Sequence, residues 1–250
     1  MNSDELKALR EDIDDIDQDI VELLVERFEI AEQIAQYKRL NGLPIENPER
    51  EQLILSSIAS QNKCFSSELT TVFSSILKSS KRIQRRCMNL YLIGMSGCGK
   101  SRCGKILSAA LNLPFVDTDR LIVSEQHRSI DTIFDTDGET SFRKMEANAL
   151  SRLAAKGGMV VATGGGILTT PSNIPLIKSS GYVVFLDRAL EKLLQQKTRN
   201  RPLLREGVEA IIRLYTERLP VYRSTADFII DPDSKGAINR ICGSYRRYIK

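Results

Sequence analysis

Residues 94–101 read Gly-Met-Ser-Gly-Cys-Gly-Lys-Ser, which is a complete G-x-x-x-x-G-K-[ST] phosphate-binding loop. The apolar segment 90–93 directly precedes it, so the sequence predicts a buried strand, a glycine-rich turn and a helix that opens at Lys100. Backbone N–H groups of such a loop bind phosphate, the lysine reaches the β- and γ-phosphates, and the Ser101 hydroxyl can ligate Mg²⁺. We therefore predict a nucleoside triphosphate site formed by Gly94, Met95, Ser96, Gly97, Cys98, Gly99, Lys100, Ser101 and Arg102.

The loop begins more than ninety residues into a chain of 250 residues, which is long enough for two domains. The charges divide in the same place. Residues 1–84 hold 10 Lys and Arg against 16 Asp and Glu, whereas residues 85–250 hold 26 against 16. An acidic segment followed by a basic one indicates two separately built units, with the boundary in the polar, basic stretch 79–87.

Composition excludes several classes of function. No run of 18 apolar residues is present, and the first residues lack the basic and apolar regions of a signal peptide, so we expect neither a membrane span nor secretion. Five cysteines without a C-x-x-C pair indicate free thiols in a reducing cytoplasm. Basic residues are scattered without interleaved aromatic residues, which argues against nucleic-acid binding.

The first segment has the pattern of a long amphipathic helix. Apolar residues recur at spacings of three and four from Leu6 to Leu23 and continue to Tyr37, and the pattern ends at Asn41-Gly42-Leu43-Pro44. Such a helix is roughly 55 Å long at 1.5 Å per residue. We expect a partner chain to cover it, and two shorter helices near 48–61 and 66–84 to complete an all-helical unit.

Arg27 occupies an apolar position of this helix, and Lys38 lies three turns further on, close to the same face. A charge on a buried face is costly unless it is paired or meets an anion. Arg27 could instead extend to solvent or pair with a carboxylate such as Glu51. Arg10 lies about a hundred degrees around the helix from Arg27, so it suits the pocket of a dimer partner better than the same pocket.

The ordered set of residues over 4–84 resembles the all-helical chorismate mutase family. It consists of Leu9-Arg10-x-x-Ile13-Asp14-x-Ile16-Asp17, Leu23-Leu24-x-Glu26-Arg27, Lys38, Pro44-Ile45-x-Asn47-Pro48-x-Arg50-Glu51 and Ser80-x-x-x-Gln84. The resemblance implies an intertwined homodimer joined through residues 4–84. It implies a chorismate pocket built from Arg27, Lys38, Arg50, Glu51, Ser80 and Gln84 of one chain and Arg10 of the other.

The resemblance also implies how that pocket works. Chorismate is a dicarboxylate, which suits a pocket lined by arginines. Its rearrangement to prephenate is unimolecular and needs no nucleophile. The pocket holds the compact conformer while Lys38 and Gln84 donate hydrogen bonds to the breaking ether oxygen. Asn47 stands where many relatives carry aspartate, and we expect this to affect substrate contacts modestly.

The second segment alternates apolar strands with helices. A helix from about 99 to 112 follows the loop, and we expect further strands at 114–116, 159–162, 182–186 and 228–230. Continuous apolar strands between helices indicate a parallel sheet covered on both faces, here with five strands. Ligands of such sheets gather at the carboxyl ends of the strands.

Polar residues lie at those ends. Asp117 and Asp119 close the second strand, and a carboxylate pair beside a phosphate loop can serve Mg²⁺ and a substrate hydroxyl. Residues 163–166 read Thr-Gly-Gly-Gly, which lets the backbone approach a small ligand closely. Two plainer alternatives remain: either aspartate could cap a helix, and the glycines could form an ordinary tight turn.

The order and spacing resemble the shikimate kinase family over roughly residues 90–232. The marks are the loop, Asp117-x-Asp119, Ser129-Ile130-x-x-Ile133-Phe134, Gly138-Glu139-x-x-Phe142-Arg143-x-x-Glu146, Thr163-Gly164-Gly165-Gly166, Arg201-Pro202-Leu203-Leu204 and Arg218-x-Pro220-x-Tyr222. The resemblance implies that Lys100 and Ser101 bind ATP and Mg²⁺, with Asp117 holding a metal-bound water. It implies that Asp119 contacts the attacking hydroxyl and can accept its proton, that Arg143, Gly165 and Arg218 seat shikimate, and that Arg201 approaches the transferring phosphoryl group from a lid.

Three features depart from the family pattern. Arg102 replaces the small hydroxyl residue usual after Lys-Ser, and His127 stands where glycine is common. The lid segment 197–200 is shorter than usual, which makes adenine stacking and lid closure harder to infer than phosphate binding.

We interpret the chain as two domains, an all-helical chorismate-mutase-like domain at 1–87 and an α/β P-loop kinase at 88–250. The prediction is a bifunctional cytoplasmic enzyme of aromatic amino-acid biosynthesis. One alternative keeps the kinase and makes residues 1–84 a ligand-sensing, dimerising module without useful catalysis. Another is a P-loop kinase for a different small polyol such as gluconate, which would leave the paired carboxylate-seating arginines without a reason.

Overall fold

The computed structural model describes residues 3–61, 63–195 and 208–249. The chain divides into two compact units. One comprises residues 1–35 and 45–84, and the other comprises residues 36–44 and 85–250.

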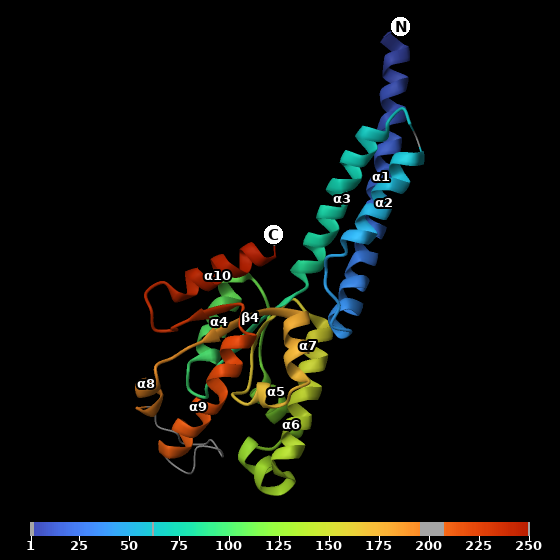
Figure 1. Cartoon of the computed structure of the whole chain (residues 1–250). Coiled ribbons are helices and arrows are strands. Elements are labelled where there is room, and N and C mark those ends of the chain that lie inside the picture. Colours follow the sequence, from blue (N-terminus) through green and yellow to red (C-terminus); the bar gives the residue numbers. More distant parts are fainter. Residues whose placement is uncertain (1–2, 62, 196–207, 250) are drawn as a thin grey trace. The chain divides into compact units, whose positions relative to one another are not determined.

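The first unit is built from three helices, which confirms the all-helical prediction for this region (Figure 1). They are α1 (Ser3–Leu40), α2 (Pro48–Gln61) and α3 (Ser66–Arg86). Acidic residues occupy the first turn of α1 and basic residues its last turn, which complements the helix dipole. Asn47 caps α2, because its Oδ1 accepts a hydrogen bond from the backbone N–H of Arg50 at 3.0 Å.

Helix α1 has two apolar faces with different surroundings. Ala31 and Ala35 are buried, as are Ile58 of α2 and Leu77 of α3. The long predicted stripe is exposed instead: the side chain of Ile16 is 57% exposed and that of Leu23 is 65% exposed. Water-facing apolar residues along several turns are typical of a surface that a partner covers, so the expected partner chain remains a prediction that this surface supports.

The second unit contains a five-stranded sheet in which all strand pairs are parallel, as the sequence predicted. The strands are β1 (Asn89–Ile93), β2 (Phe115–Asp117), β3 (Val160–Ala162), β4 (Gly181–Leu186) and β5 (Phe228–Ile230). Their order is β2-β3-β1-β4-β5. Strands β1, β3 and β4 are buried throughout, which explains their continuous apolar sequences.

Helices cover both faces of this sheet. They are α4 (Lys100–Leu111), α5 (Thr118–Gln126), α6 (Ile130–Lys156), α7 (Asn173–Ser180), α8 (Leu190–Leu194), α9 (Val208–Thr225) and α10 (Ala237–Tyr248), together with the short η1 (Ile167–Thr169). The chain moves outward from β1 to β2 and then in the opposite direction through β3, β4 and β5. Right-handed crossovers therefore place α4 and α10 on one face and α6, α7 and α9 on the other (Figure 1).

Two irregular backbone positions explain sequence features of this unit. His127 has φ 53°, in the left-handed region, and ends α5. Glycine adopts this conformation most easily, which explains why glycine is common at the position that His127 occupies. Gly138 has φ 79° and interrupts α6, so the helix bends just before the turn that carries Arg143.

Residues 36–44 join the second unit through Arg39, which is only 4% exposed. Its Nε and Nη2 donate hydrogen bonds to the carbonyl oxygens of Ala154 and Ala155, each at 3.2 Å. These carbonyls belong to the last turn of α6, where a cation also meets the negative end of the helix dipole. The sequence pattern did not single out Arg39.

Candidate functional sites

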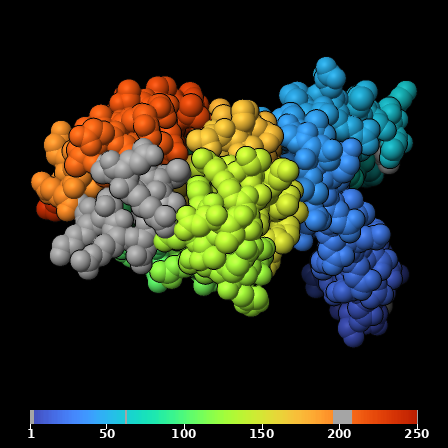
Figure 2. Space-filling model, turned by 90° about the horizontal axis from the view of Figure 1, so that it is seen from below, coloured from blue at the N-terminus to red at the C-terminus, as the bar shows by residue number. Residues whose placement is uncertain are grey.

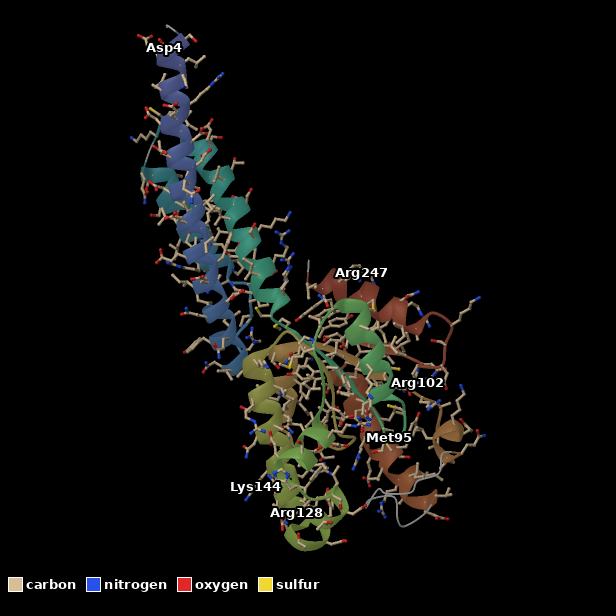
Figure 3. All side chains as sticks on the ribbon, turned by 180° about the vertical axis from the view of Figure 1, so that it is seen from behind. Asp4, Met95, Arg102, Arg128, Lys144 and Arg247 are labelled. Carbon is tan, nitrogen blue, oxygen red and sulfur yellow. The ribbon has the colours of Figure 1, made fainter. Side chains whose placement is uncertain are left out.

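The glycine-rich loop leaves β1 and opens α4 at Lys100, as predicted. Lys100 is buried, and its Nζ donates to the carbonyl oxygens of Gly94 at 2.7 Å and Met95 at 2.9 Å. The ammonium group therefore lies over the loop, where a phosphate would meet it. Figure 3 shows Met95 inside the second unit, whereas Arg102 points outward from α4 and is exposed.

Ser101 and Asp117 meet beside the loop. The Ser101 hydroxyl donates to Oδ2 of Asp117 at 2.5 Å, so the first turn of α4 and the end of β2 present two oxygen ligands together. Oδ1 of Asp117 accepts from the backbone N–H of Arg120 at 3.2 Å. Asp117 therefore caps α5, as the plainer alternative predicted. It uses Oδ1 for this cap, whereas Oδ2 contacts Ser101.

Arg143 and Glu146 form an ion pair on α6. The Arg143 side chain donates from Nη1 to Oε2 of Glu146, and from Nη2 to Oε1 of Glu139 at 2.8 Å. Glu146 is 1% exposed, and its Oε1 has no hydrogen-bond partner among the described residues. Burial raises the pKa of Glu146 above its ordinary value, and the nearby Arg143 opposes this shift.

The glycine triplet after β3 is packed tightly against these charged groups. A Cβ atom added at Gly164 would lie 2.3 Å from Oε1 of Glu146 and 2.6 Å from Oδ1 of Asp119. The same atom at Gly166 would lie 2.3 Å from Nη1 of Arg143. The triplet is therefore more than an ordinary turn, because only glycine leaves room for two carboxylates and a guanidinium beside the backbone.

Gly165 joins the triplet to α9. Its carbonyl oxygen accepts from Nη1 of Arg218 at 3.0 Å and also from the hydroxyl of Tyr222. Burial raises the pKa of Tyr222, which keeps the phenol a hydrogen-bond donor. A cavity of about 610 Å³ opens here, and its lining includes Glu139, Gly165 and Arg218. Helices α6 and α9 both reach the surface of this unit in Figure 2.

A second cluster lies in the helical unit. Nη1 of Arg27 on α1 donates to Oγ of Ser80 on α3 at 2.5 Å, which brings together two residues predicted for the chorismate pocket. Gln84 lies one turn beyond Ser80, is 8% exposed, and its Oε1 has no partner among the described residues. Glu51, which the sequence offered as a partner for Arg27, instead forms a salt bridge with Lys81 at 2.9 Å.

The other residues predicted for the two sites lie as follows. Arg10 and Arg50 are exposed on α1 and α2. Lys38 is half-buried and belongs to the second compact unit. Asp119 follows β2 and faces Gly164. Arg201 and the lid segment 197–200 lie outside the described residues. No group of three or more possible metal ligands occurs in the described part of the chain.

Sequence reasoning gave no role to Glu146, Glu139 or Tyr222, although all three carry contacts in this site. A signal was available: Glu146 follows Arg143 by three residues and Tyr222 follows Arg218 by four, which places each pair on one helix face.

Among the described helices, none is both long and apolar enough to cross a lipid bilayer.

Family models match both parts of the chain. The shikimate kinase model matches residues 96–245, and the chorismate mutase type II model matches residues 9–85. The shikimate kinase of Clostridium beijerinckii is 42% identical over 142 residues, which are 56% of this chain and 83% of that protein. The shikimate kinase of Francisella tularensis subsp. holarctica is 39% identical over 164 residues, covering 62% and 93%.

Solved structures agree with the sequence matches. The structure of shikimate kinase from Acinetobacter baumannii in complex with shikimate aligns with a TM-score of 0.60 at 33% identity, covering 64% of this chain and 92% of that chain. The shikimate kinase of Aquifex aeolicus aligns with a TM-score of 0.56 at 34% identity, covering 65% and 96%. The part left uncovered is about the length of the helical segment.

Proposed function

Because the chain belongs to the shikimate kinase family and also carries a chorismate mutase type II domain, we propose that it phosphorylates shikimate with ATP and rearranges chorismate to prephenate. It is a bifunctional enzyme of aromatic amino-acid biosynthesis. The observation that carries the kinase assignment is that Lys100 lies over the loop after β1, while Asp119 and Arg143 lie against the glycine triplet after β3, whose Gly165 packs beside Ser96 of the first loop.

In the kinase site, the loop from Gly94 to Arg102 binds the triphosphate and Lys100 turns its ammonium from the loop carbonyls to the β- and γ-phosphates. Arg143 and Arg218 seat the shikimate carboxylate beside Gly165. Arg143 comes to this task already oriented by two glutamates, and Arg218 by the Gly165 carbonyl. Oriented guanidinium groups suit a planar carboxylate because they can donate two parallel hydrogen bonds.

Asp119 accepts the proton of the shikimate hydroxyl that attacks the γ-phosphorus. Its carboxylate lies against Gly164, next to the buried side chain of Glu146. The oxygen then bonds to phosphorus as the bond to the β-phosphate oxygen breaks, and ADP leaves. Catalysis of this kind rests on positioning and charge neutralisation. Arg201 is proposed to approach the transferring group.

Mg²⁺ fits the pair formed by Ser101 and Asp117. Both side chains offer oxygen atoms, the ligands that Mg²⁺ prefers, and they already touch. Bound there with the nucleotide, the ion neutralises phosphate charge. Ser101 is proposed as the direct ligand, and Asp117 as the residue that holds a metal-bound water.

The mutase pocket is proposed to consist of Arg27, Lys38, Arg50, Glu51, Ser80 and Gln84 from one chain and Arg10 from its partner. The hydrogen bond from Arg27 to Ser80 supports this assignment, because it places a cation beside the buried Gln84 on one side of α3. Lys38 and Gln84 are proposed to donate to the ether oxygen that breaks. Gln84 would donate through Nε2, while its buried Oε1, which has no partner among the described residues, would be satisfied by a hydrogen-bond donor of the ligand.

A homodimer formed through residues 4–84 is part of the proposal, since the exposed apolar stripe of α1 requires a cover. A cytoplasmic location agrees with the five cysteines, none of which forms a disulfide in the described structure.

Assays of the full chain test the proposal directly. We expect ADP release with shikimate and ATP, and loss of chorismate absorbance with formation of prephenate. A panel that includes gluconate separates a shikimate kinase from a kinase for another polyol. Chorismate turnover at the level of the uncatalysed reaction, with tight binding of prephenate, would instead identify the helical domain as a ligand-sensing module.

A further inference from the structure

Arg188 connects the phosphate loop to a neighbouring loop. It lies just after β4, and its Nη1 donates to the carbonyl oxygen of Gly97 at 3.1 Å. The other side of the same guanidinium meets Asp233, with Nη2 to Oδ1 at 2.9 Å and Nε to Oδ2 at 3.1 Å. Lys192 of α8 adds a bond from Nζ to Oδ2 of Asp233 at 3.0 Å. None of these residues belongs to the predicted site except Gly97.

The connected segments lie at the carboxyl ends of three adjacent strands. Gly97 follows β1, Arg188 follows β4 and Asp233 follows β5, and these strands are neighbours in the sheet. Asp233 itself is held in an ordered turn, because its backbone N–H donates to Oδ1 of Asp231 at 2.9 Å and the N–H of Ser234 donates to the Asp231 carbonyl at 3.1 Å. The backbone that carries Asp233 is therefore ordered by contacts that do not involve Arg188.

The contact at Gly97 matters because of what that peptide group does. Gly97 has φ 87°, a conformation that glycine adopts and leaves easily. Its carbonyl and the N–H of Cys98 share one rigid peptide plane. A hydrogen bond that fixes the carbonyl therefore also fixes the direction of this N–H, which donates to the Met95 carbonyl at 3.2 Å, and with it the shape of a loop whose N–H groups bind phosphate. A loop ordered in advance loses less conformational entropy when the nucleotide binds.

We propose that Arg188 is a positioning residue for the nucleotide: through the Gly97 carbonyl it holds the phosphate loop in its binding conformation, and Asp233 orients Arg188 for this role. Lys192 supports Asp233 from the same side. The inference rests on the proposed ATP-dependent kinase activity.

The test compares Arg188→Ala with the wild-type chain. We expect the Kd for a non-hydrolysable ATP analogue with Mg²⁺, measured by calorimetry, and the KM for ATP to rise about tenfold, the effect of losing one charge-assisted hydrogen bond. The kcat and the KM for shikimate should stay within about twofold of wild type, because the shikimate contacts come from other loops. Arg188→Lys should recover part of the affinity, since an ammonium group can reach one of the two acceptors.

A double-mutant cycle tests the role of Asp233. Asp233→Asn alone should weaken nucleotide binding, whereas in the Arg188→Ala background it should add nothing, because Asp233 acts through Arg188. Arg223→Ala is the matched control: it removes an ion pair with Asp187, one residue before Arg188, without a contact to the phosphate loop. We expect this control to leave the Kd unchanged.

Three results would overturn the inference. They are an unchanged nucleotide Kd in folded Arg188→Ala, an equal rise in the KM for shikimate, and additive effects of the two substitutions. If Arg188→Ala does not fold, Asp233→Asn carries the test, and an unchanged Kd in that variant overturns the inference. The calorimetric arm needs no shikimate, so it separates this inference from the proposed kinase reaction: a wild-type chain that binds the analogue but does not phosphorylate shikimate contradicts only the latter.

Discussion

Nη1 of Arg143 donates a hydrogen bond to Oε2 of Glu146, three residues along α6, and the Glu146 carboxylate is almost fully buried. A buried carboxylate is costly unless it is paired, and its second oxygen, which no described residue contacts by a hydrogen bond, adds to that cost. Glu146 is placed where it orients a guanidinium that is proposed to seat the substrate carboxylate. This relationship makes Glu146 a residue whose substitution should affect substrate binding without touching the nucleotide.

Glu146→Ala should raise the KM for shikimate by about tenfold or more, because Arg143 loses the acceptor that orients it. Glu146→Gln should have a much smaller effect, since the amide oxygen still accepts from Arg143. The measurement is steady-state kinetics with each substrate varied in turn. The KM for ATP is the internal control and should not change. If the KM for shikimate in Glu146→Ala equals that of the wild type, Glu146 does not position Arg143.

The buried Glu146 also predicts a pH dependence of stability. Burial raises its pKa above the ordinary value of 4.5, so the folded chain holds this proton more tightly than the unfolded chain does. The resulting stabilisation is fully present below pH 4.5 and is lost as the pH rises through the raised pKa. Glu146→Gln cannot ionise and should lack this dependence.

Urea unfolding at a series of pH values tests this prediction. The free energy of unfolding of the wild type minus that of Glu146→Gln should fall with rising pH across that window and become constant above it. A difference that does not vary with pH would mean that Glu146 titrates alike in the folded and unfolded chains.

Lys100→Ala should lower kcat for shikimate phosphorylation by about a hundredfold or more, because the β- and γ-phosphates lose their principal cation. Chorismate turnover should stay within about threefold of wild type, since all the proposed mutase residues except Lys38 belong to the other compact unit and the effects of substitutions at independent sites add. Lys105→Ala, an exposed lysine of the same helix, is the matched control. Loss of both activities in folded Lys100→Ala would show that the two sites are not independent.

Much of this arrangement was accessible from the sequence because it depends on local patterns. The phosphate loop, the long first helix and the parallel strands are each recognised from the spacing of residues that are close together in the sequence. His127 illustrates this well: a position where glycine is common turned out to have a left-handed backbone. Family motifs then placed Arg143, Gly165 and Arg218 near one another.

Other contacts could not be predicted because they join segments far apart in the chain. Arg39 ends on carbonyl groups more than a hundred residues away, and Arg188 links the loops after three different strands. Nothing in the local pattern around either arginine indicates which acceptor it will find. The same holds for the packing of the glycine triplet, where the close carboxylates come from α5 and α6.

Arg27→Ala and Lys38→Ala should each lower mutase kcat/KM by about a hundredfold, because each removes a cation proposed to face a dianionic ligand. Kinase activity should not change. Lys78→Ala, an exposed residue of α3, is the control for loss of positive charge. Near-normal turnover in Arg27→Ala would mean that its hydrogen bond to Ser80 serves only to join α1 and α3.

The exposed stripe of α1 predicts a homodimer that exchanges catalytic residues. Light scattering should give twice the chain mass of 28.1 kDa at micromolar concentration. Ile16→Glu places a charge on the stripe and should yield monomers that keep kinase activity but lose mutase activity. A monomeric wild-type chain would contradict both the dimer and the assignment of Arg10 to the partner's pocket.

Mixing two inactive variants tests that assignment directly. In a heterodimer of Arg10→Ala and Arg27→Ala chains, one pocket receives both substitutions and the other receives neither, provided that Arg10 crosses to the partner. Random reassortment of equal amounts makes half of the dimers mixed, so about a quarter of wild-type mutase activity should return. If Arg10 serves the pocket of its own chain, every pocket in the mixture lacks one arginine and no activity returns. Kinase activity, which needs neither residue, measures how much folded protein each mixture contains.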